Sequence, residues 1–256
     1  AQFFASDVAQ VFATVDDDAL QSQLKSANAE AARAMQAQVE ADFPRIWEEF
    51  RGLADGLALP VEEVFLWNCR GDFVRAQSVD GCTTVFGPCA DGWLIAHNED
   101  GLPSLDGACG LLEATPAQGM AFTSFVYPGS IPGHTFAVNA AGLVSTVNNI
   151  RPTRIPAGLP RQVLARAVLE CASLEAAVDM LSRTGRAGAF HHTLGQVGSA
   201  HLLSVEACSS GVAVRKVRRL GGHSNHLLDA GLDAAGQRIT GSSGSRQRLS
   251  LIHISE

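Results

Sequence analysis

The amino-acid sequence predicts an α+β protein in which two stacked β-sheets are covered by helices on both outer faces, a four-layer αββα sandwich. Two observations lead to this prediction. Apolar residues recur at helical spacing between Leu20 and Leu57 and again between Val163 and Leu181, and β-rich runs follow each of these regions. The order of helices, strands, two helices and strands suits stacked sheets and does not suit alternating βαβ units.

The first helical region divides into shorter helices. Pro44 separates two of them, and Asp42 is the expected N-cap of the second, because proline fits the first helical turn and a carboxylate can cap it. Pro60 then opens a short helix that reaches Trp67. The apolar positions that define one face of this region are Val39, Phe43, Ile46, Phe50, Leu53 and Leu57, at steps of four and three.

Two β-hairpins follow the change of pattern at Ser78–Gly81. The dipeptide Asp91-Gly92 is a strong turn signal, and it lies between the strand-like runs Thr83–Phe86 and Trp93–Ala96. A second hairpin is expected further along the chain. It joins His134–Val138 to Leu143–Val147 through a turn at Asn139–Gly142.

Two helices and another pair of strands complete the pattern. Val163–Cys171 carries one apolar helical face, and Ser173 is the expected cap of the helix that follows. Strands are then expected at His201–Val205 and Val212–Arg215, joined by a turn at Ser209–Gly211.

The C-terminal region carries no such pattern. Gly236–Gly244 is rich in small polar residues without apolar periodicity, and Leu249–Glu256 has no clear packing partner. We therefore expect the chain to be truncated at its C-terminus, with one sheet edge left open by missing strands.

Composition excludes several classes of protein. The chain has 256 residues, 46% of them hydrophobic and 18% charged, which is enough apolar material for a large core and excludes disorder. Its formal net charge is -7, and the basic run Arg215–Arg219 fits the solvated face of a strand rather than a nucleic-acid surface. Nucleic acid is therefore not an expected partner. A membrane is not expected either, because no stretch of about 20 apolar residues is present.

Cysteine usage indicates a reducing compartment. The six cysteines form no CxxC pair, and a chain of this size does not need disulfide bonds. We expect a cytoplasmic protein in which most cysteines are small buried apolar residues. The chain begins at Ala1 rather than Met, so a removed leader stays an open alternative.

Gly81 and Cys82 stand where a loop gives way to a strand. Glycine gives the backbone freedom at a bond to be cut, and a thiol there could attack the preceding carbonyl and release a new N-terminus. Cys82 would then carry a nucleophilic sulfur and an α-amine suited to proton transfer near neutrality. The alternative is a buried cysteine that simply begins a strand.

Five short motifs follow one another around and after this cysteine. They are Asp80–Thr84, His97–Asp100, Asn139–Leu143, Ser204–Glu206 and His223–His226. Through these motifs the sequence resembles the acyl-coenzyme A:6-aminopenicillanic acid acyltransferase family, cysteine N-terminal-nucleophile (Ntn) hydrolases related to choloylglycine hydrolases. The resemblance covers roughly Val61 to Leu228, and the motifs occur in the family's order.

The resemblance implies roles for four residues. Cys82 would be the nucleophile and, through its amine, the base. Asp100 would orient and charge-balance that amine, because a nearby carboxylate favours the ammonium form. Asn225 would donate its side-chain amide to the oxyanion. Asn148 could be a second donor, and a strand-end residue without catalytic role is the alternative.

The resemblance further implies an Ntn-type sandwich that cuts itself between Gly81 and Cys82. Residues 1–81 would be a helical smaller subunit, residues 82–256 the catalytic core of the same domain, and the two fragments would stay associated. The expected activity is hydrolysis of a linear, non-peptide amide through an acyl-thioester, without cofactor or metal, on a small-molecule amide or acyl donor. An acyl-coenzyme A-dependent acyltransferase and a catalytically silent truncated homologue are the alternatives.

Substrate contacts are expected from Asn98, Thr83 and Ser204. Glu99 and Gly101 stand where the fungal acyltransferases carry aromatic residues, and Asn98 stands where bile-salt relatives use arginine, so neither substrate is implied. His191, His192 and His201 lack a zinc-like pattern and are expected to be structural. An apolar pocket is expected to use some of Trp93, Phe122, Phe125, Tyr127 and Phe136.

Overall fold

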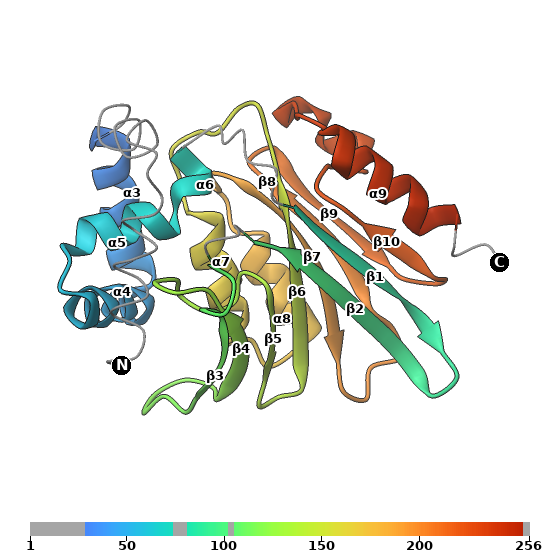
Figure 1. Ribbon diagram of the computed structural model, residues 1–256, viewed down its shortest axis with the longest axis horizontal. Coiled ribbons are helices and arrows are strands. Elements are labelled where there is room, and N and C mark those ends of the chain that lie inside the picture. The colour runs from blue at the N-terminus through green and yellow to red at the C-terminus, as the bar shows by residue number, and fades with distance from the viewer. Residues whose placement is uncertain (1–28, 74–80, 102–104, 253–256) are drawn as a thin grey trace.

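The computed structural model describes residues 29–73, 81–101 and 105–252, with element labels as in Figure 1. The described chain begins with four helices that gather at one end of the molecule. They are α3 (Ala29–Asp42), α4 (Pro44–Leu57), α5 (Val61–Asn68) and the single turn α6 (Arg70–Phe73). The predicted break at Pro44 and the short helix after Pro60 are thereby confirmed, whereas the predicted helix before residue 29 and the change at 78–80 lie outside the described residues.

Asp42 is not the N-cap of α4, so that prediction is wrong. Asp42 is the last residue of α3, and the cap position is held by Phe43, which makes no side-chain capping hydrogen bond. Pro44 occupies the first helical turn, where its missing N–H leaves one donor fewer to satisfy. Asp42 instead forms an ion pair with Arg183, 3.3 Å away.

A three-stranded antiparallel sheet contains the first predicted hairpin. Its order is β10-β1-β2, formed by β1 (Gly81–Cys89), β2 (Gly92–Asp100) and β10 (Gly221–His223). Cys89 pairs with Gly92 across a two-residue turn. Gly92 has φ = +132°, a conformation that side chains rarely allow, which explains the glycine after Asp91.

A seven-stranded antiparallel sheet forms the larger part of the protein, and its strands lie in sequence order. The second predicted hairpin is its β5–β6 pair, with a turn in which the Asn139 side chain accepts hydrogen bonds from the N–H groups of Ala141 and Leu143. The strands are β3 (Gly110–Ala114), β4 (Phe122–Val126), β5 (Phe136–Asn139), β6 (Leu143–Ile150), β7 (Ala189–Gln196), β8 (Leu203–Cys208) and β9 (Gly211–Lys216).

Two helices, α7 (Arg161–Val168) and α8 (Leu174–Leu181), pack on one face of the large sheet. Ser173 caps α8 as predicted, because its side chain accepts a hydrogen bond from the N–H of Ala176 at 3.2 Å. The main hydrophobic core joins the N-terminal helices, α7, α8 and the large sheet. Its fully buried members include Phe50, Phe65, Val163, Ala177, Leu181, Leu194 and Val205.

The inner face of the small sheet packs against the large sheet. Phe86 of β1 forms an apolar cluster with Leu202 and Val217, and Trp93 and Ile95 of β2 complete it. Phe86 also stacks on His191 of β7, with ring centroids 6.1 Å apart. The protein is therefore an α+β structure with a large antiparallel sheet, as the sequence predicts.

The C-terminal region is ordered where the sequence pattern indicates no structure. Helix α9 (Gly241–Ile252) lies along the small sheet (Figure 1) and follows the 3-10 helix η2 (Ala230–Ala235). Its anchors are polar: Gln247 accepts a hydrogen bond from the Ser224 N–H at 2.8 Å and donates one to the Gly222 carbonyl at 2.7 Å. The sequence around Gly236–Gly244 has no core pattern, but its last residues begin this helix, which hydrogen bonds rather than apolar contacts hold in place. Truncation at the C-terminus stays a prediction. None of the helices in the described ranges has the length and apolar character that a membrane span requires.

Candidate active site

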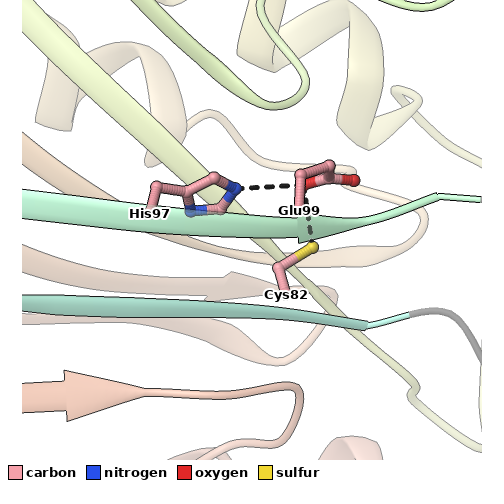
Figure 2. A group of neighbouring side chains, drawn as sticks. All are labelled: Cys82, His97 and Glu99. Atoms are coloured by element: carbon pink, nitrogen blue, oxygen red, sulfur yellow. Dashed lines mark hydrogen bonds and ion pairs between the residues drawn. The ribbon is translucent and has the colours of Figure 1, made fainter. Parts of the chain in front are cut away.

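Cys82 lies directly opposite Glu99 on the hairpin formed by β1 and β2. Residues opposite each other in an antiparallel ladder project from the same face, and Sγ of Cys82 donates a hydrogen bond to Oε2 of Glu99 at 3.0 Å (Figure 2). Cys82 is 5% exposed. The sulfur is thus held against a carboxylate at the margin of the protein interior.

Two further side chains hold the Glu99 carboxylate. His97 Nε2 lies 3.0 Å from Oε2, and the Tyr127 hydroxyl donates to Oε1 at 2.6 Å. Burial raises the pKa of Tyr127 above its usual value, and the negative charge of Glu99 raises it further. Tyr127 therefore keeps its proton and serves Glu99 as a donor.

A chain of hydrogen bonds continues from His97 into the space between the two sheets. His97 Nδ1 lies 2.9 Å from Oγ1 of Thr84, and this hydroxyl donates to Oδ1 of Asn148 at 2.7 Å. His191 Nδ1 lies 3.2 Å from the same Oδ1, and its Nε2 lies 2.8 Å from Oγ of Ser204. Burial lowers the pKa of His191 well below its usual value, so its ring is neutral.

Asn225 lies beside Cys82, as the family resemblance implies. The side-chain oxygen of Asn225, rather than its amide nitrogen, faces Cys82. The backbone N–H of Cys82 donates to Oδ1 of Asn225 at 3.0 Å. The amide nitrogen of Asn225 points elsewhere and donates to the Asn149 carbonyl at 2.9 Å. A role as oxyanion donor would require this amide to leave Asn149, and it stays a prediction.

Arg246 of α9 reaches the same point of the chain, a contact that the sequence does not predict. Its Nη1 donates to the Cys82 carbonyl at 2.5 Å and to Oγ1 of Thr83 at 2.8 Å, and its Nη2 donates to Oδ1 of Asn225 at 2.7 Å. A Cβ on Gly81 would clash with Nη2 and lie 2.7 Å from that Oδ1. The glycine before Cys82 therefore meets a steric need. An arginine in a serine-rich tail gave no signal of this role.

The other residues with implied roles lie apart from the sulfur. Asp100 accepts a hydrogen bond from Asn98 at 2.6 Å, and strand alternation places both, with Thr83, on the face opposite to Sγ. Asn148 lies inside β6 rather than at a strand end, and with Ser204 it belongs to the network between the sheets. The structure thus brings Cys82 and Asn225 together, and it places Glu99 rather than Asp100 next to the thiol.

The aromatic residues named from the sequence divide into two groups. Tyr127 and Phe125 pack edge to face, Phe125 stacks on Phe136, and the Phe136 ring lies 6.2 Å from that of His97. These three rings therefore form one aromatic cluster that contacts Glu99 through Tyr127 and His97 through Phe136. Phe122 projects from the other face of β4, where the Arg166 guanidinium lies 4.7 Å above its ring. Trp93 packs in the cluster with Phe86.

Cys82, His97 and Glu99 could also hold a cation. Sγ, a ring nitrogen and a carboxylate oxygen of these residues all lie within 4.8 Å of one another. A thiolate, an imidazole and a carboxylate are suitable ligands for zinc. Figure 2 shows that the same atoms are already joined by hydrogen bonds.

Comparison with known proteins decides the family. Residues 88–253 match the family model described as acyl-coenzyme A:6-aminopenicillanic acid acyl-transferase. The chain belongs to this family. The match includes Glu99, Asn148 and Asn225, whereas Gly81 and Cys82 precede it.

Two curated relatives of this acyltransferase-family protein are named for different reactions, one for acyl transfer and one for hydrolysis. It is 27% identical over 201 residues to the 40 kDa form of acyl-coenzyme A:6-aminopenicillanic-acid-acyltransferase from Emericella nidulans, covering 77% of this chain and 56% of the relative. It is 27% identical over 169 residues to the β-alanyl-dopamine/carcinine hydrolase of Drosophila melanogaster, covering 57% and 43%. The chain spans about half the length of these curated relatives.

Among solved structures, the Caenorhabditis elegans orthologue of N-acylethanolamine-hydrolyzing acid amidase is similar to part of the chain. The TM-score is 0.43 and the sequence identity is 14%, over 57% of this chain and 70% of that one.

Proposed function

We propose that this protein is an Ntn amidohydrolase that cleaves a linear, non-peptide amide with Cys82 as its nucleophile. The observation that carries the proposal is the position of Cys82, whose thiol donates to Glu99 while its nitrogen contacts Asn225. A cysteine becomes a nucleophile when a neighbouring group can take its proton. The names of the relatives from Emericella nidulans and Drosophila melanogaster, an acyltransferase and a hydrolase, support the same reaction class.

The proposal includes self-cleavage between Gly81 and Cys82. Residues 1–81 would become the smaller subunit and residues 82–256 the catalytic core. The two fragments would stay bound, because Phe50 and Phe65 of the first share one apolar core with Leu164 and Leu194 of the second. Fully burying one such side chain contributes about 1.5–3 kcal/mol.

In the proposed reaction, Cys82 attacks the amide carbonyl and its new α-amine acts as base. The amine product leaves with a proton from the α-ammonium, and water resolves the acyl-thioester. Asp100 would balance the ammonium charge, and Asn225, aided by Asn148, would stabilise the oxyanion. A donor of this kind typically contributes about 2.7–4 kcal/mol.

Two finer points belong to the same proposal. The complete fold would be a four-layer αββα sandwich, supported by α9 against the small sheet and by α7 and α8 against the large one. A cytoplasmic location is supported by the six cysteines, none of which forms a disulfide bond in the described residues. The reaction as written needs no cofactor or metal.

Mass spectrometry of the purified chain tests self-cleavage. Wild-type protein should give two masses that meet at Gly81–Cys82, whereas Cys82→Ala should stay intact and inactive. Cys89→Ala is the matched control, because Cys89 lies exposed at the end of β1 and should be replaceable without effect. An uncut wild type that hydrolyses amides would remove self-cleavage from the proposal.

Activity assays separate hydrolysis from the alternatives. A library of N-acyl amines should reveal hydrolysis that Cys82→Ala abolishes. Incubation with an acyl-coenzyme A thioester and an amine acceptor tests the acyltransferase alternative, in which the new amide would outweigh the free acid. A cut chain without turnover in either assay would indicate a silent homologue.

A further inference from the structure

The uncut chain needs a base other than the one proposed for the finished enzyme. Before cleavage the nitrogen of Cys82 is a peptide amide, and it donates its hydrogen to Oδ1 of Asn225. A peptide N–H cannot take the thiol proton. Self-cleavage nevertheless requires the thiolate as attacking species. Some other group must therefore accept the proton of Cys82 in this step.

We propose that Glu99 is this proton acceptor and that His97 and Tyr127 position its carboxylate. The inference rests on the self-cleavage proposed above. Oε2 of Glu99 lies 3.0 Å from Sγ of Cys82, within hydrogen-bond reach for a sulfur donor. Because Glu99 touches a reacting atom, its role would be catalytic.

The hydrogen-bond network indicates which groups carry protons. Nδ2 of Asn148 donates to the His223 carbonyl, so its Oδ1 faces Thr84 and accepts the only hydroxyl hydrogen of that residue. Oγ1 of Thr84 must then accept from Nδ1–H of His97. Nε2 of His97 lies 3.0 Å from Oε2 of Glu99, so the ring is held at both nitrogens and fixes the direction of that oxygen.

This arrangement directs the thiol proton to Glu99. A thiolate and a carboxylate 3.0 Å apart would repel each other strongly, so loss of the thiol proton and gain of a proton by Glu99 occur together. His97, whose side chain is only 3% exposed, contacts the same oxygen and holds it in place. Tyr127 holds Oε1 and leaves Oε2 directed at the sulfur.

The step balances as follows. The proton moves from Sγ of Cys82 to Oε2 of Glu99 while the sulfur bonds to the carbonyl carbon of Gly81. The C–N bond then breaks, and Glu99 returns the proton to the departing nitrogen of Cys82. A thioester joins Gly81 to the sulfur, and water hydrolyses it to a Gly81 carboxyl group and a free thiol. The released α-amine can take over as base in later turnovers.

Variants of Glu99 test the proposal through the rate of cleavage, followed by denaturing gel and intact mass. Glu99→Gln should cut at least about 100-fold more slowly than wild type, and Glu99→Asp should lose less. Glu113→Gln, which changes an exposed carboxylate on β3, should cut at the wild-type rate. Glu99→Gln cutting as fast as wild type would overturn the inference while leaving the proposed function intact.

Chemical rescue excludes a merely structural role for Glu99. Formate should restore cleavage to Glu99→Ala by supplying a carboxylate in the vacated space. No rescue by formate would overturn the inference. A wild-type chain that never cuts would instead overturn the proposed self-cleavage, and the inference with it.

Discussion

The thiol of Cys82 and the carboxylate of Glu99 lie directly opposite each other on one hairpin, 3.0 Å apart. The ladder of β1 and β2 sets this distance, because cross-strand partners share one face of the sheet. The large sheet supplies the partners that hold the pair, with Tyr127 at one end and Asn148 at the other end of the hydrogen-bond chain. A local hairpin thus carries the reacting atoms, and the rest of the fold orients them.

Replacement of Arg246 by methionine should slow self-cleavage without unfolding the protein. The variant loses the hydrogen bonds to the Cys82 carbonyl and to Asn225, so the bond to be cut is less firmly placed. Loss of such positioning should slow cleavage by roughly 10- to 100-fold. Cleavage rates of Arg246→Met and Arg248→Met should be compared, since Arg248 is exposed and contacts Ser245 within α9. Equal rates for the two would contradict a positioning role.

A methyl group at residue 81 should interfere with the same contacts. In Gly81→Ala the new Cβ clashes with Arg246 and crowds Asn225, so we expect slower cleavage in a folded protein. The double variant Gly81→Ala/Arg246→Ala should cut faster than the product of the two single-variant rate losses predicts, because removal of the arginine also removes the clash. Gly52→Ala is the control, because its Cβ would meet open space. If Gly81→Ala cuts at the wild-type rate, the contacts around residue 81 do not control cleavage.

Stability should fall as the pH drops from about 6.5 to about 4, and His134 should account for part of the loss. Burial lowers the pKa of His134 from 6.5 to about 4, so in this interval the unfolded chain binds a proton that the native state does not. The loss reaches roughly 3 kcal/mol, since one pKa unit corresponds to about 1.4 kcal/mol. Burial of His192, whose pKa falls to about 3, acts in the same direction.

Urea unfolding at several pH values measures this dependence. His134→Gln should have a shallower decrease of unfolding free energy below pH 6.5 than the wild type, because it has no proton to gain. His201→Gln, at a partly exposed position, should keep the wild-type slope. A wild-type slope in His134→Gln would mean that other groups cause the acid sensitivity.

Zinc should inhibit cleavage, and a chelator should not. Zn²⁺ would bind the Cys82 sulfur together with His97 and Glu99, whose donor atoms lie within 4.8 Å of one another, and would thereby withdraw the nucleophile. The test is the cleavage rate of Cys89→Ala protein, which lacks the exposed thiol, with added zinc and with EDTA. Cleavage that EDTA abolishes and zinc restores would favour a functional metal over the hydrogen-bonded carboxylate.

Local sequence signals predicted the elements that depend on local chemistry. The turn after Asp91, the cap at Ser173 and the helix that begins after Pro60 each follow from one residue and its neighbours. The failure at Asp42 has a local cause as well, since helix α3 continues to that residue and Pro44 starts α4 without a side-chain cap. Helix α9 escaped prediction because Gln247 and Ser243 anchor it by hydrogen bonds, which leave no apolar periodicity.

The sequence predicts the site in part. The family motifs predict that Cys82 and Asn225 meet, and the two residues are in contact. The motifs give Glu99 no role, although a two-residue hairpin turn places Cys82 on the same face as residues 97 and 99 rather than Asp100. Nothing in the sequence predicts the contact of Arg246, because no local pattern shows that α9 returns to the start of β1.

The apolar core shared by the N-terminal helices and the large sheet has a consequence for refolding. An intact chain recovers its structure by a process within one molecule, whose rate does not depend on protein concentration. A chain cut after Gly81 would have to bring two separate pieces together, so its renaturation from denaturant would become second order and would fail on dilution. A chain that folds first and is cut afterwards would therefore reach its native state readily once, and would regain it only with difficulty after unfolding.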